Sequence, residues 1–317
     1  MSQASFKPET SVPDLSGRVY LITGGTTGLG AGAISLIAAK GPAKIFFSGR
    51  NRSRADDLIT KIKQSSVSTE IIFLECDLSS LTSVQQTAKQ FLAQSNRLDV
   101  LMCNAGIMAV PPSLSNEGYE IQFATNHLGH ALLIKLLLPT LLKTAELPDS
   151  DVRIVNLSST GYTTTPSSGI DFDTLKTSQA SLGPMYQPKT FTRYGQSKLA
   201  NLLYPIELAK RYPTITSVAI HPGFIKTNLT MGGGFFNRQV FAAARLMNRI
   251  SGGRDVTFEE GPYNQIWAAT TPKENLKNGA YYEPMGQLVV PTTIHGRNPT
   301  LAKKLYEWTE RELAAFE

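Results

Sequence analysis

Short apolar runs rich in β-branched and aromatic residues alternate with longer, helix-like stretches along the first half of the chain. This alternation is typical of repeated strand–helix–strand units that build a parallel sheet. The runs are apolar on both faces, as expected for strands covered by helices on both sides. The expected strands are Arg18–Thr23, Lys44–Ser48, Glu70–Glu75, Val100–Cys103, Arg153–Leu157 and Ser217–Ile220. The pattern therefore predicts an α/β fold with a doubly wound parallel sheet, in which ligands bind beyond the carboxyl ends of the strands.

One stretch, Ala131–Leu142, is apolar almost all round, so we expect a helix buried on more than one side. Its periodicity does not distinguish a core helix from one that also packs against a second subunit. Assembly as a homodimer or homotetramer is therefore left open. A chain of 317 residues can form one large domain. We expect an N-terminal extension at residues 1–14 and a single folded domain at residues 15–317.

The composition is that of an ordinary globular protein, with 41% hydrophobic and 18% charged residues. No unbroken apolar segment reaches the roughly 18 residues that a membrane-spanning helix requires. The polar segment Met1–Ser16 lacks the pattern of a secretory signal, so a cytoplasmic location without a membrane span is expected. The net charge is +6, but the basic residues are dispersed apart from Arg50, Arg52 and Arg54. Nucleic-acid binding, which needs a basic face, is not expected.

Two cysteines, Cys76 and Cys103, lie at the ends of predicted strands and are interpreted as small core residues. No cluster of His, Cys and carboxylate residues has the spacing of metal ligands, so no catalytic metal is expected. His221 precedes a Pro-Gly pair and is interpreted as a structural, hydrogen-bonding histidine.

A glycine-rich turn follows the first predicted strand and opens a helix that runs toward Lys40. Glycines let the backbone approach a pyrophosphate, which the amides and the dipole of the helix N-terminus stabilise. The position of the turn between a strand and a helix therefore predicts a dinucleotide-binding site. The residues expected to form it are Gly24, Thr26, Thr27, Gly28, Leu29 and Gly30.

The end of the second strand distinguishes the two nicotinamide cofactors. NAD sites usually place an acidic residue there to bind the ribose 2′-hydroxyl. This chain has Arg50 and Asn51 instead. A guanidinium can bind a 2′-phosphate through charge-assisted hydrogen bonds, whereas a carboxylate would repel it. We therefore expect NADP(H); the alternative is that Arg50 is a solvated loop cation.

Two further strand ends extend the predicted cofactor site. Asp77 and Leu78 follow the third strand, and Asn104, Ala105 and Gly106 follow the fourth. We expect Asp77 to accept a hydrogen bond from the adenine amino group, and Asn104 to stabilise the central strand. Both residues would serve equally well as helix caps or turn residues.

Tyr194 and Lys198 are four residues apart and so share one face of a predicted helix. A free tyrosine has a pKa near 10 and is a poor base at neutral pH. A neighbouring cation favours the phenolate, so we expect Lys198 and an oxidised nicotinamide to lower the pKa of Tyr194. The pair could then pass a proton to or from a substrate oxygen during hydride transfer.

These motifs occur in the order found in the short-chain dehydrogenase/reductase superfamily, which the chain resembles from Leu15 to about Phe316. The matching residues are Thr23–Gly30, Asn104–Gly106, Asn126, Ser159, Tyr194 with Lys198, and Pro222–Gly223. The resemblance implies a Rossmann-type sheet of about seven strands in the order 3-2-1-4-5-6-7.

The resemblance also implies roles for individual residues. Tyr194 is the general acid/base, Lys198 holds the nicotinamide ribose hydroxyls, and Ser159 orients the substrate oxygen, with Ser158 as the competing serine. Asn126 would bind a water that links Lys198 to solvent. The remaining implied cofactor contacts are Pro222, Gly223, Ile225 and Thr227, the last of which would contact the carboxamide.

The chain is most similar to the branch with retinol dehydrogenases and WW-domain oxidoreductases, and especially to their fungal relatives, which often serve secondary metabolism. Ser159 and Tyr194 are 35 positions apart, farther than in compact family members. The chain has neither WW modules nor a hydrophobic N-terminal anchor, so retinoid specificity is not implied.

The segment at residues 228–260 begins with glycines and aromatic residues, which suits a helical lid over an apolar substrate, although a surface helix or a subunit contact would fit as well. The residues expected to line the substrate pocket are Met108, Met185, Tyr186, Phe224 and Phe235. We therefore expect an NADP(H)-dependent oxidoreductase that interconverts a carbonyl and an alcohol on an apolar or aromatic small molecule. The alternatives are a catalytically inactive NADP-binding scaffold protein and a sugar-nucleotide epimerase or dehydratase.

Overall fold

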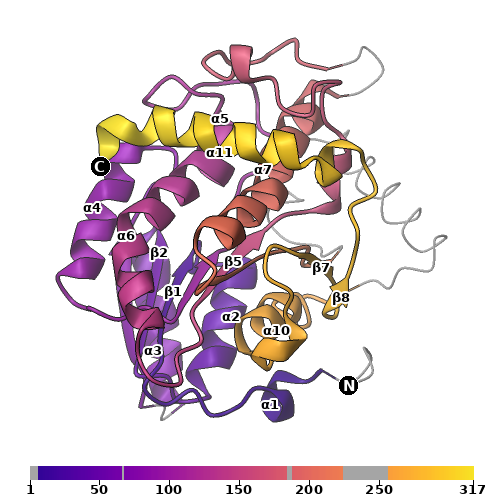
Figure 1. Ribbon diagram of the computed structural model, residues 1–317. Coiled ribbons are helices and arrows are strands. Elements are labelled where there is room, and N and C mark those ends of the chain that lie inside the picture. Colours follow the sequence, from indigo (N-terminus) through magenta and orange to yellow (C-terminus); the bar gives the residue numbers. More distant parts are fainter. Residues whose placement is uncertain (1–5, 66–67, 184–187, 224–255) are drawn as a thin grey trace.

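A parallel sheet forms the centre of the molecule (Figure 1). The computed structural model describes residues 6–65, 68–183, 188–223 and 256–317. The strands are β1 (Val19–Thr23), β2 (Lys44–Gly49), β3 (Glu70–Glu75), β4 (Val100–Cys103), β5 (Arg153–Leu157), β6 (Thr216–Ile220), β7 (Tyr281–Glu283) and β8 (Gln287–Leu288). Their order is β3-β2-β1-β4-β5-β6-β7-β8. The predicted doubly wound α/β fold and its strand order are confirmed.

The sheet has one strand more than the resemblance implies. β8 pairs antiparallel with β7, whereas the other neighbouring strands pair in parallel. It consists of Gln287 and Leu288 alone, too short a segment to show an apolar pattern. The six strands expected from the sequence all form, with ends that differ by no more than one residue, as is usual at element boundaries.

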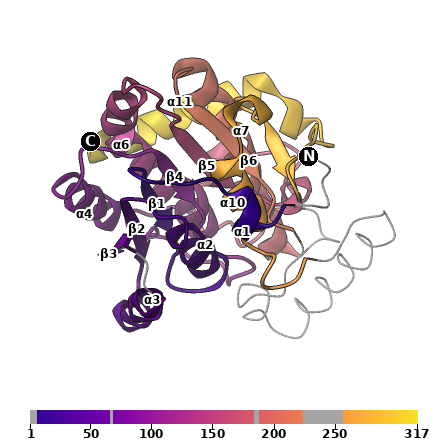
Figure 2. The ribbon, with the colours of Figure 1, turned by 90° about the horizontal axis from the view of Figure 1, so that it is seen from below.

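Helices cover both faces of the sheet, and the view from below separates the two layers (Figure 2). One layer contains α2 (Gly28–Ala38), α3 (Arg52–Gln64) and α10 (Tyr263–Thr270), with α1 (Pro8–Ser11) against α10. The other contains α4 (Leu81–Leu92), α6 (Gly129–Ala145), α7 (Lys189–Arg211) and α11 (Pro299–Leu313). Shorter elements are α5 (Ile121–Phe123), the π-helix η1 (Ala124–Leu128), and the 3₁₀ turns η2 (Thr160–Thr163), η3 (Phe172–Thr174), η4 (Lys273–Asn275), η5 (His295–Arg297) and η6 (Ala314–Phe316).

Alternate residues of each strand enter the two apolar cores. On β1, Leu21 packs with the layer of α4, α6 and α7, and Ile22 packs with the layer of α2, α3 and α10. Both side chains are fully buried. This alternation follows from the two-residue period of a strand and explains why the strand sequences are apolar on both faces.

The apolar run predicted as a helix forms α6. The helical stretch Ile121–Ala145, which also includes α5 and η1, is long and apolar enough to cross a membrane by length and composition. However, 56% of its most apolar window is buried inside the molecule, and a core helix of a soluble protein meets the same criterion. Leu132, Leu133 and Leu137 of α6 belong to the core on this face of the sheet.

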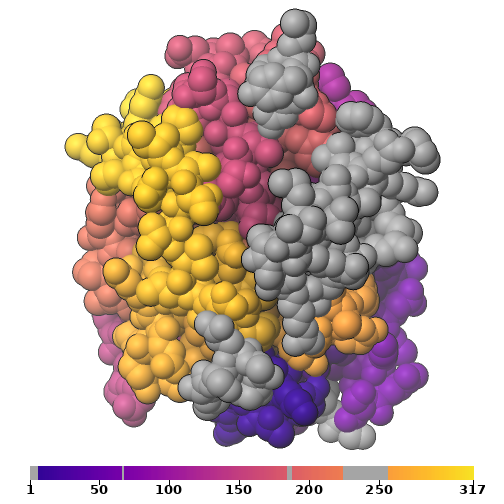
Figure 3. Space-filling model, turned by 90° about the vertical axis from the view of Figure 1, so that its right-hand side faces the viewer, coloured from indigo at the N-terminus to yellow at the C-terminus, as the bar shows by residue number. Residues whose placement is uncertain are grey.

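The N-terminal and C-terminal regions both pack onto the sheet layers. The ring of Phe6 lies against that of Tyr263 on α10, and Val12 is buried. α11 lies across α7, and together with η6 it closes the layer over α4 and α6 (Figure 1). From one side, the C-terminal residues (yellow), the α10 region (orange) and the N-terminal residues (indigo) share one face (Figure 3).

Asp99, just before β4, fixes the start of the two central strands. Its fully buried carboxylate accepts hydrogen bonds from the Val19 amide at 2.8 Å, from Arg18 at 3.1 Å and from Arg97 at 2.8 Å. An Asp99→Ala variant would leave a buried amide without its acceptor and two arginines without their partner. We expect a loss of about 3 kcal/mol in the free energy of unfolding, measured by urea denaturation.

The matched control for this prediction is Glu70→Ala. Glu70 pairs with Lys44 at 3.2 Å, but its side chain is 58% exposed. An exposed ion pair contributes less than about 1 kcal/mol. Equal losses in the two variants would contradict the role assigned to Asp99.

Candidate active site

A cleft of about 410 Å³ lies along the edge of the sheet where β1 to β6 end. It is lined by Gly24, Thr26, Thr27, Gly28, Leu29, Gly30, Ser48, Gly49, Arg50, Cys76, Asp77, Leu78, Ser79, Asn104, Ala105, Gly106, Ile107, Met108, Ile121, Thr125, Leu157, Ser158, Ser159, Tyr194, Lys198, His221, Pro222 and Gly223. Most of the residues that the sequence singles out therefore meet in one place, which is the position where doubly wound sheets bind ligands.

The glycine-rich turn connects β1 to α2. Within it, the backbone at Gly30 packs tightly against the backbone at Gly24. A Cβ atom on Gly30 would lie 2.3 Å from the carbonyl oxygen of Gly24, closer than any side chain can come. Thr27 is the N-cap of α2, but its side chain makes no capping hydrogen bond. The helix N-terminus therefore faces the cleft, where its amides and its dipole favour a negatively charged group.

The ends of β1 and β4 are joined by a set of hydrogen bonds around Thr23, whose side chain is fully buried. The Asn104 side-chain amide donates to the carbonyl oxygen of Thr23 at 2.7 Å, and the Thr23 hydroxyl accepts from the amides of Asn104 and Ala105 at 3.0 Å each. His130 on α6 lies 2.8 Å from the same hydroxyl. Burial lowers the pKa of His130 to about 4, so it acts as a neutral ring. These contacts fix the floor of the cleft.

Arg50 and Asp77 lie at the ends of β2 and β3 and both face the cleft. The Arg50 guanidinium is 71% exposed and lies 4.0 Å from the Asp77 carboxylate, so the pair is loose. Asp77 also accepts hydrogen bonds from the amide and hydroxyl of Ser79, at 2.9 and 2.7 Å. The guanidinium therefore remains accessible to a ligand.

Asn51 does not line the cleft, in contrast to its predicted place in the cofactor site. It is the N-cap of α3, and its side chain accepts a hydrogen bond from the amide of Arg54 at 2.9 Å. Asparagine suits a helix cap as well as a ligand contact, and the sequence does not separate the two roles.

Asn126 lies in the π-helix η1, fully buried behind the cleft surface. Its amide nitrogen donates to the Ile107 carbonyl at 3.0 Å and to the Ser197 hydroxyl at 2.9 Å, while its oxygen accepts from the Ile107 amide at 2.8 Å. Asn126 therefore ties the loop after β4 to α7. A Cβ atom on Gly106 would lie 3.2 Å from the Asn126 oxygen and 3.4 Å from Lys198 Nζ, so these two groups border the same small space.

Tyr194 and Lys198 lie on α7, with Lys198 Nζ 5.7 Å from the centre of the Tyr194 ring. Ser159 hydrogen bonds to Tyr194, and its hydroxyl also accepts from the Gly161 amide at 3.1 Å. The hydroxyl of Ser158 instead donates to the main-chain carbonyl of Lys198 at 2.7 Å. Of the two candidate serines, Ser159 is thus the one whose side chain lies beside Tyr194.

Burial controls the electrostatics of this pair. It raises the pKa of Tyr194 to about 12, an effect that the hydrogen bond from Ser159 only partly offsets. It lowers the pKa of Lys198 to about 8, and the ammonium donates to the Leu157 carbonyl at 2.9 Å. In the protein alone the pKa of Tyr194 is thus raised, because burial desolvates the phenolate. The expected lowering by Lys198 and a bound oxidised nicotinamide stays a prediction.

Several lining residues were not predicted from the sequence. Gly49, Cys76, Ser79, Ile107 and Leu157 directly flank residues that the sequence singled out, and Ser48 lies two positions before Arg50. Ile121 and Thr125 are four residues apart on one helical face, which is the signal that would have found them. His221 also lines the cleft, and burial lowers its pKa to about 3, so it acts as a neutral ring.

Some predicted positions lie outside the described residues: Met185, Tyr186, Phe224, Ile225, Thr227, Phe235 and all but the last five residues of the proposed lid at 228–260. Met108, the remaining predicted substrate contact, lines the cleft. Within the described ranges, no group of three or more His, Cys, Asp or Glu residues could hold a metal ion. Cys76 and Cys103 are buried free thiols there.

The fold defines a doubly wound α/β protein with a cleft at the carboxyl ends of its strands, and comparison with known proteins assigns its family. The sequence model of the family described as short chain dehydrogenase matches residues 18–169. An uncharacterized oxidoreductase of Schizosaccharomyces pombe is 39% identical over 306 residues, which cover 95% of this chain and 86% of the relative. A short-chain dehydrogenase/reductase of Aspergillus calidoustus is 34% identical over 96% of both chains.

The solved structures agree with this assignment at the level of the fold. A putative uncharacterized protein from Mycobacterium paratuberculosis superimposes with a TM-score of 0.70 at 25% identity, covering 96% of both chains. The chain belongs to the short-chain dehydrogenase/reductase family of oxidoreductases.

Proposed function

We propose that the protein is an NADP(H)-dependent oxidoreductase that interconverts a carbonyl and an alcohol on an apolar or aromatic small molecule. The observation that carries the proposal is that Tyr194, Ser159 and Lys198 share one cleft with the glycine-rich turn. This arrangement supports the proposal, because hydride transfer to a carbonyl requires a proton donor beside the dinucleotide.

The residues of the cleft fit a dinucleotide. The N-terminus of α2 supports binding of a pyrophosphate, because the close packing of Gly30 against Gly24 keeps side chains out of its path. The exposed guanidinium of Arg50 supports NADP(H) over NAD(H), since it can bind a 2′-phosphate. Asp77 and Leu78 form the wall proposed to receive the adenine.

A nicotinamide cofactor bound in this cleft would supply the hydride for reduction and accept it in oxidation. In reduction, the carbonyl carbon gains the hydride while Tyr194 donates its hydroxyl proton to the carbonyl oxygen, which becomes the alcohol. In oxidation, Tyr194 removes the proton of the alcohol. Burial raises the pKa of Tyr194 to about 12, which favours the protonated form that acts as the acid in reduction. In oxidation, Tyr194 must first lose its own proton before it can take up that of the alcohol.

The remaining polar groups would position the reactants. Ser159 would donate a hydrogen bond to the substrate oxygen beside Tyr194. The Lys198 ammonium has three N–H donors, and those not used in the hydrogen bond to the Leu157 carbonyl would bind the ribose hydroxyls. We propose that Asn126, which borders the same space as Lys198, supports the water through which Lys198 exchanges protons with solvent. Ile107 and Met108 give the cleft an apolar wall that suits an apolar or aromatic substrate.

The cofactor assignment is tested by titrating the protein with NADPH and NADH and following fluorescence. We expect a preference for NADPH that Arg50→Ala lowers by about 10-fold to 100-fold, because a charge-assisted contact to the 2′-phosphate is lost. The control is Arg54→Ala, which removes an exposed cation from the same region without touching the cleft. Equal binding of NADH and NADPH by the wild type would contradict the role of Arg50.

The alternative of an inactive cofactor-binding protein makes a different prediction. It requires NADPH binding without NADPH oxidation in the presence of any carbonyl compound. A screen of aromatic and aliphatic aldehydes and ketones, followed by NADPH absorbance, separates the two functions.

A further inference from the structure

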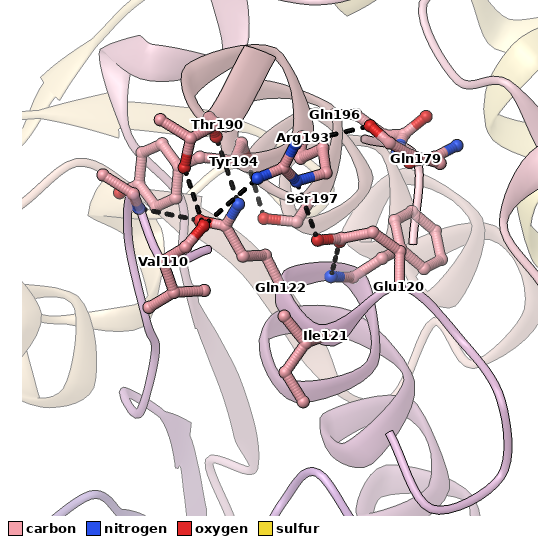
Figure 4. Close-up of polar contacts among 12 residues, drawn as sticks. Val110, Glu120, Ile121, Gln122, Gln179, Thr190, Arg193, Tyr194, Gln196 and Ser197 are labelled. Carbon is pink, nitrogen blue, oxygen red and sulfur yellow. Dashed lines mark hydrogen bonds and ion pairs between the residues drawn. The ribbon is translucent and has the colours of Figure 1, made fainter. Parts of the chain in front are cut away.

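A buried ion pair lies beside the candidate active site and has no part in the chemistry proposed above. Arg193, the residue before Tyr194, places its Nε atom 3.3 Å from the Glu120 carboxylate (Figure 4). The Arg193 side chain is 2% exposed and that of Glu120 is fully buried. Removing two charged groups from water has a desolvation cost that can exceed the free energy of their attraction. A buried ion pair therefore adds little to the stability of the fold.

Arg193 joins two segments of the chain that the sequence does not place together. Its guanidinium donates to the Val110 carbonyl at 3.1 Å and to the Gln179 carbonyl at 3.3 Å. Val110 belongs to the loop after β4, and Gln179 belongs to the long segment between Ser159 and Tyr194. The planar fork of an arginine is suited to hold several acceptors at fixed angles. One side chain thus fixes both segments relative to α7.

Glu120, the partner of Arg193, connects the ion pair to α5 and to the segment around Leu175. Its second oxygen accepts from the Phe123 amide at 2.7 Å, which makes it the N-cap of α5. Its own amide donates to the Leu175 carbonyl at 2.8 Å. α5 continues directly into η1, which carries Asn126. The ion pair therefore links the helix of Tyr194 to the helical segment of Asn126.

Neighbouring amides complete the network seen in Figure 4. Gln122 accepts from the Ala109 amide at 2.8 Å and donates to the Thr190 carbonyl at 3.1 Å. Gln196 donates to the Gln179 side chain at 2.7 Å. At the other end of the loop, Ile107 is held by Asn126. The Ile107–Val110 segment, which places Met108 in the cleft, is thus fixed at both ends.

We infer that Glu120 and Arg193 form a positioning pair that sets the distance between the Tyr194 hydroxyl and the cleft wall formed by Ile107 and Met108. The inference rests on the proposed function, because this gap is where the substrate carbonyl must lie to receive the proton. A misplacement of about 1 Å in such a site costs about 100-fold in rate. The pair touches neither substrate nor cofactor and acts through Tyr194.

The test compares four variants with the wild type, using benzaldehyde and acetophenone as carbonyl probes. Glu120→Gln removes the negative charge of the pair. Arg193→Lys keeps the positive charge but removes the planar guanidinium with its several donors. Glu120→Gln/Arg193→Met removes both charges at similar volume, which restores the stability that a single unpaired buried charge would cost. The matched control is Glu312→Gln, because Glu312 bonds the Tyr119 hydroxyl at 2.6 Å but lies outside the network.

We expect the three network variants to bind NADPH within about 3-fold of the wild type and to lose about 10-fold to 100-fold in kcat, with a smaller change in KM. Glu312→Gln should behave as the wild type. A double variant that regains wild-type kcat together with its stability would overturn the inference, since the pair would then be merely structural. So would a loss of kcat that only parallels a loss of NADPH binding.

A pH profile provides a readout that stability alone would not change. Burial raises the pKa of Glu120 to about 6. Arg193 faces the carboxyl from α7, and the amides of Gln122 and Phe123 face it from its own segment. Below this pKa the wild type carries a neutral Glu120, as the Glu120→Gln variant does at every pH. The ratio of their kcat values should therefore fall toward 1 between about pH 8 and about pH 5, while groups common to both cancel. A constant ratio would contradict the inference.

A Tyr194→Phe variant in the same assay separates the two proposals. If the wild type oxidises NADPH with a probe and Tyr194→Phe does not, the proposed function stands and the network variants alone decide the positioning role. If the wild type binds NADPH but oxidises it with no compound of the aldehyde and ketone screen described above, the proposed function and the inference that rests on it both fail.

Discussion

Replacing Tyr194 by phenylalanine should lower kcat by about 10² to 10⁴ while leaving the NADPH affinity unchanged. The substitution keeps the ring, which is buried between Ser159 and Lys198, and removes only the hydroxyl that donates the proton. Because burial holds the tyrosine in its protonated form, no other change in charge accompanies the substitution at neutral pH. Steady-state kinetics and a fluorescence titration with NADPH measure the two quantities.

The control is Tyr204→Phe, which removes a hydroxyl from a buried tyrosine on the same helix, where the ring stacks on Tyr306 instead of facing the cleft. Its turnover should stay close to that of the wild type. Unchanged turnover in Tyr194→Phe would refute the acid/base assignment. A parallel loss of activity in both variants would point to the packing of α7 instead.

The second large effect is expected at the glycine-rich turn. In a Gly30→Ala variant the new methyl group would meet the Gly24 carbonyl carbon at 2.9 Å and its oxygen at 2.3 Å, so the backbone of the turn must move. This displaces the N-terminus of α2 from the proposed pyrophosphate position. We expect the Kd for NADPH to rise by about 100-fold or more, measured by isothermal titration calorimetry.

Gly32→Ala is the matched control, since it lies on the same helix but faces the ring of Pro262 at 2.7 Å rather than the turn. It should cost stability and leave the Kd for NADPH within about 3-fold. An unchanged Kd in Gly30→Ala would show that the turn does not carry the cofactor.

The sequence predicted the site best where one short, continuous segment contains both the secondary-structure elements and the residues proposed to bind the cofactor. β1, the turn at Gly24 and α2 form one continuous signal, because apolar strand residues, glycines and helix residues follow one another directly. The same holds for Asn104 at the end of β4. Since the carboxyl ends of parallel strands share one edge, locating the strands was sufficient to locate the cleft.

The sequence was least informative where a role depends on distant partners. Glu120 and Arg193 are polar residues within ordinary helical patterns, and neither shows locally that it pairs with the other. Asn51 caps α3, and in a sequence a capping asparagine looks the same as a ligand-binding one. The direction of the Tyr194 pKa shift depends on burial, which a neighbouring lysine in the sequence does not reveal.

The packing of α11 has a consequence for how the protein is made. Its residue Trp308 contacts Phe123, and Thr309 bonds His127, so α11 supports the segment that carries Asn126. Tyr306 stacks on Tyr204 of α7, the helix of Tyr194. During translation α11 emerges after every strand of the sheet. Because a domain generally folds as a unit, the two helical segments beside the cleft gain their outer support only after α11 has been synthesised.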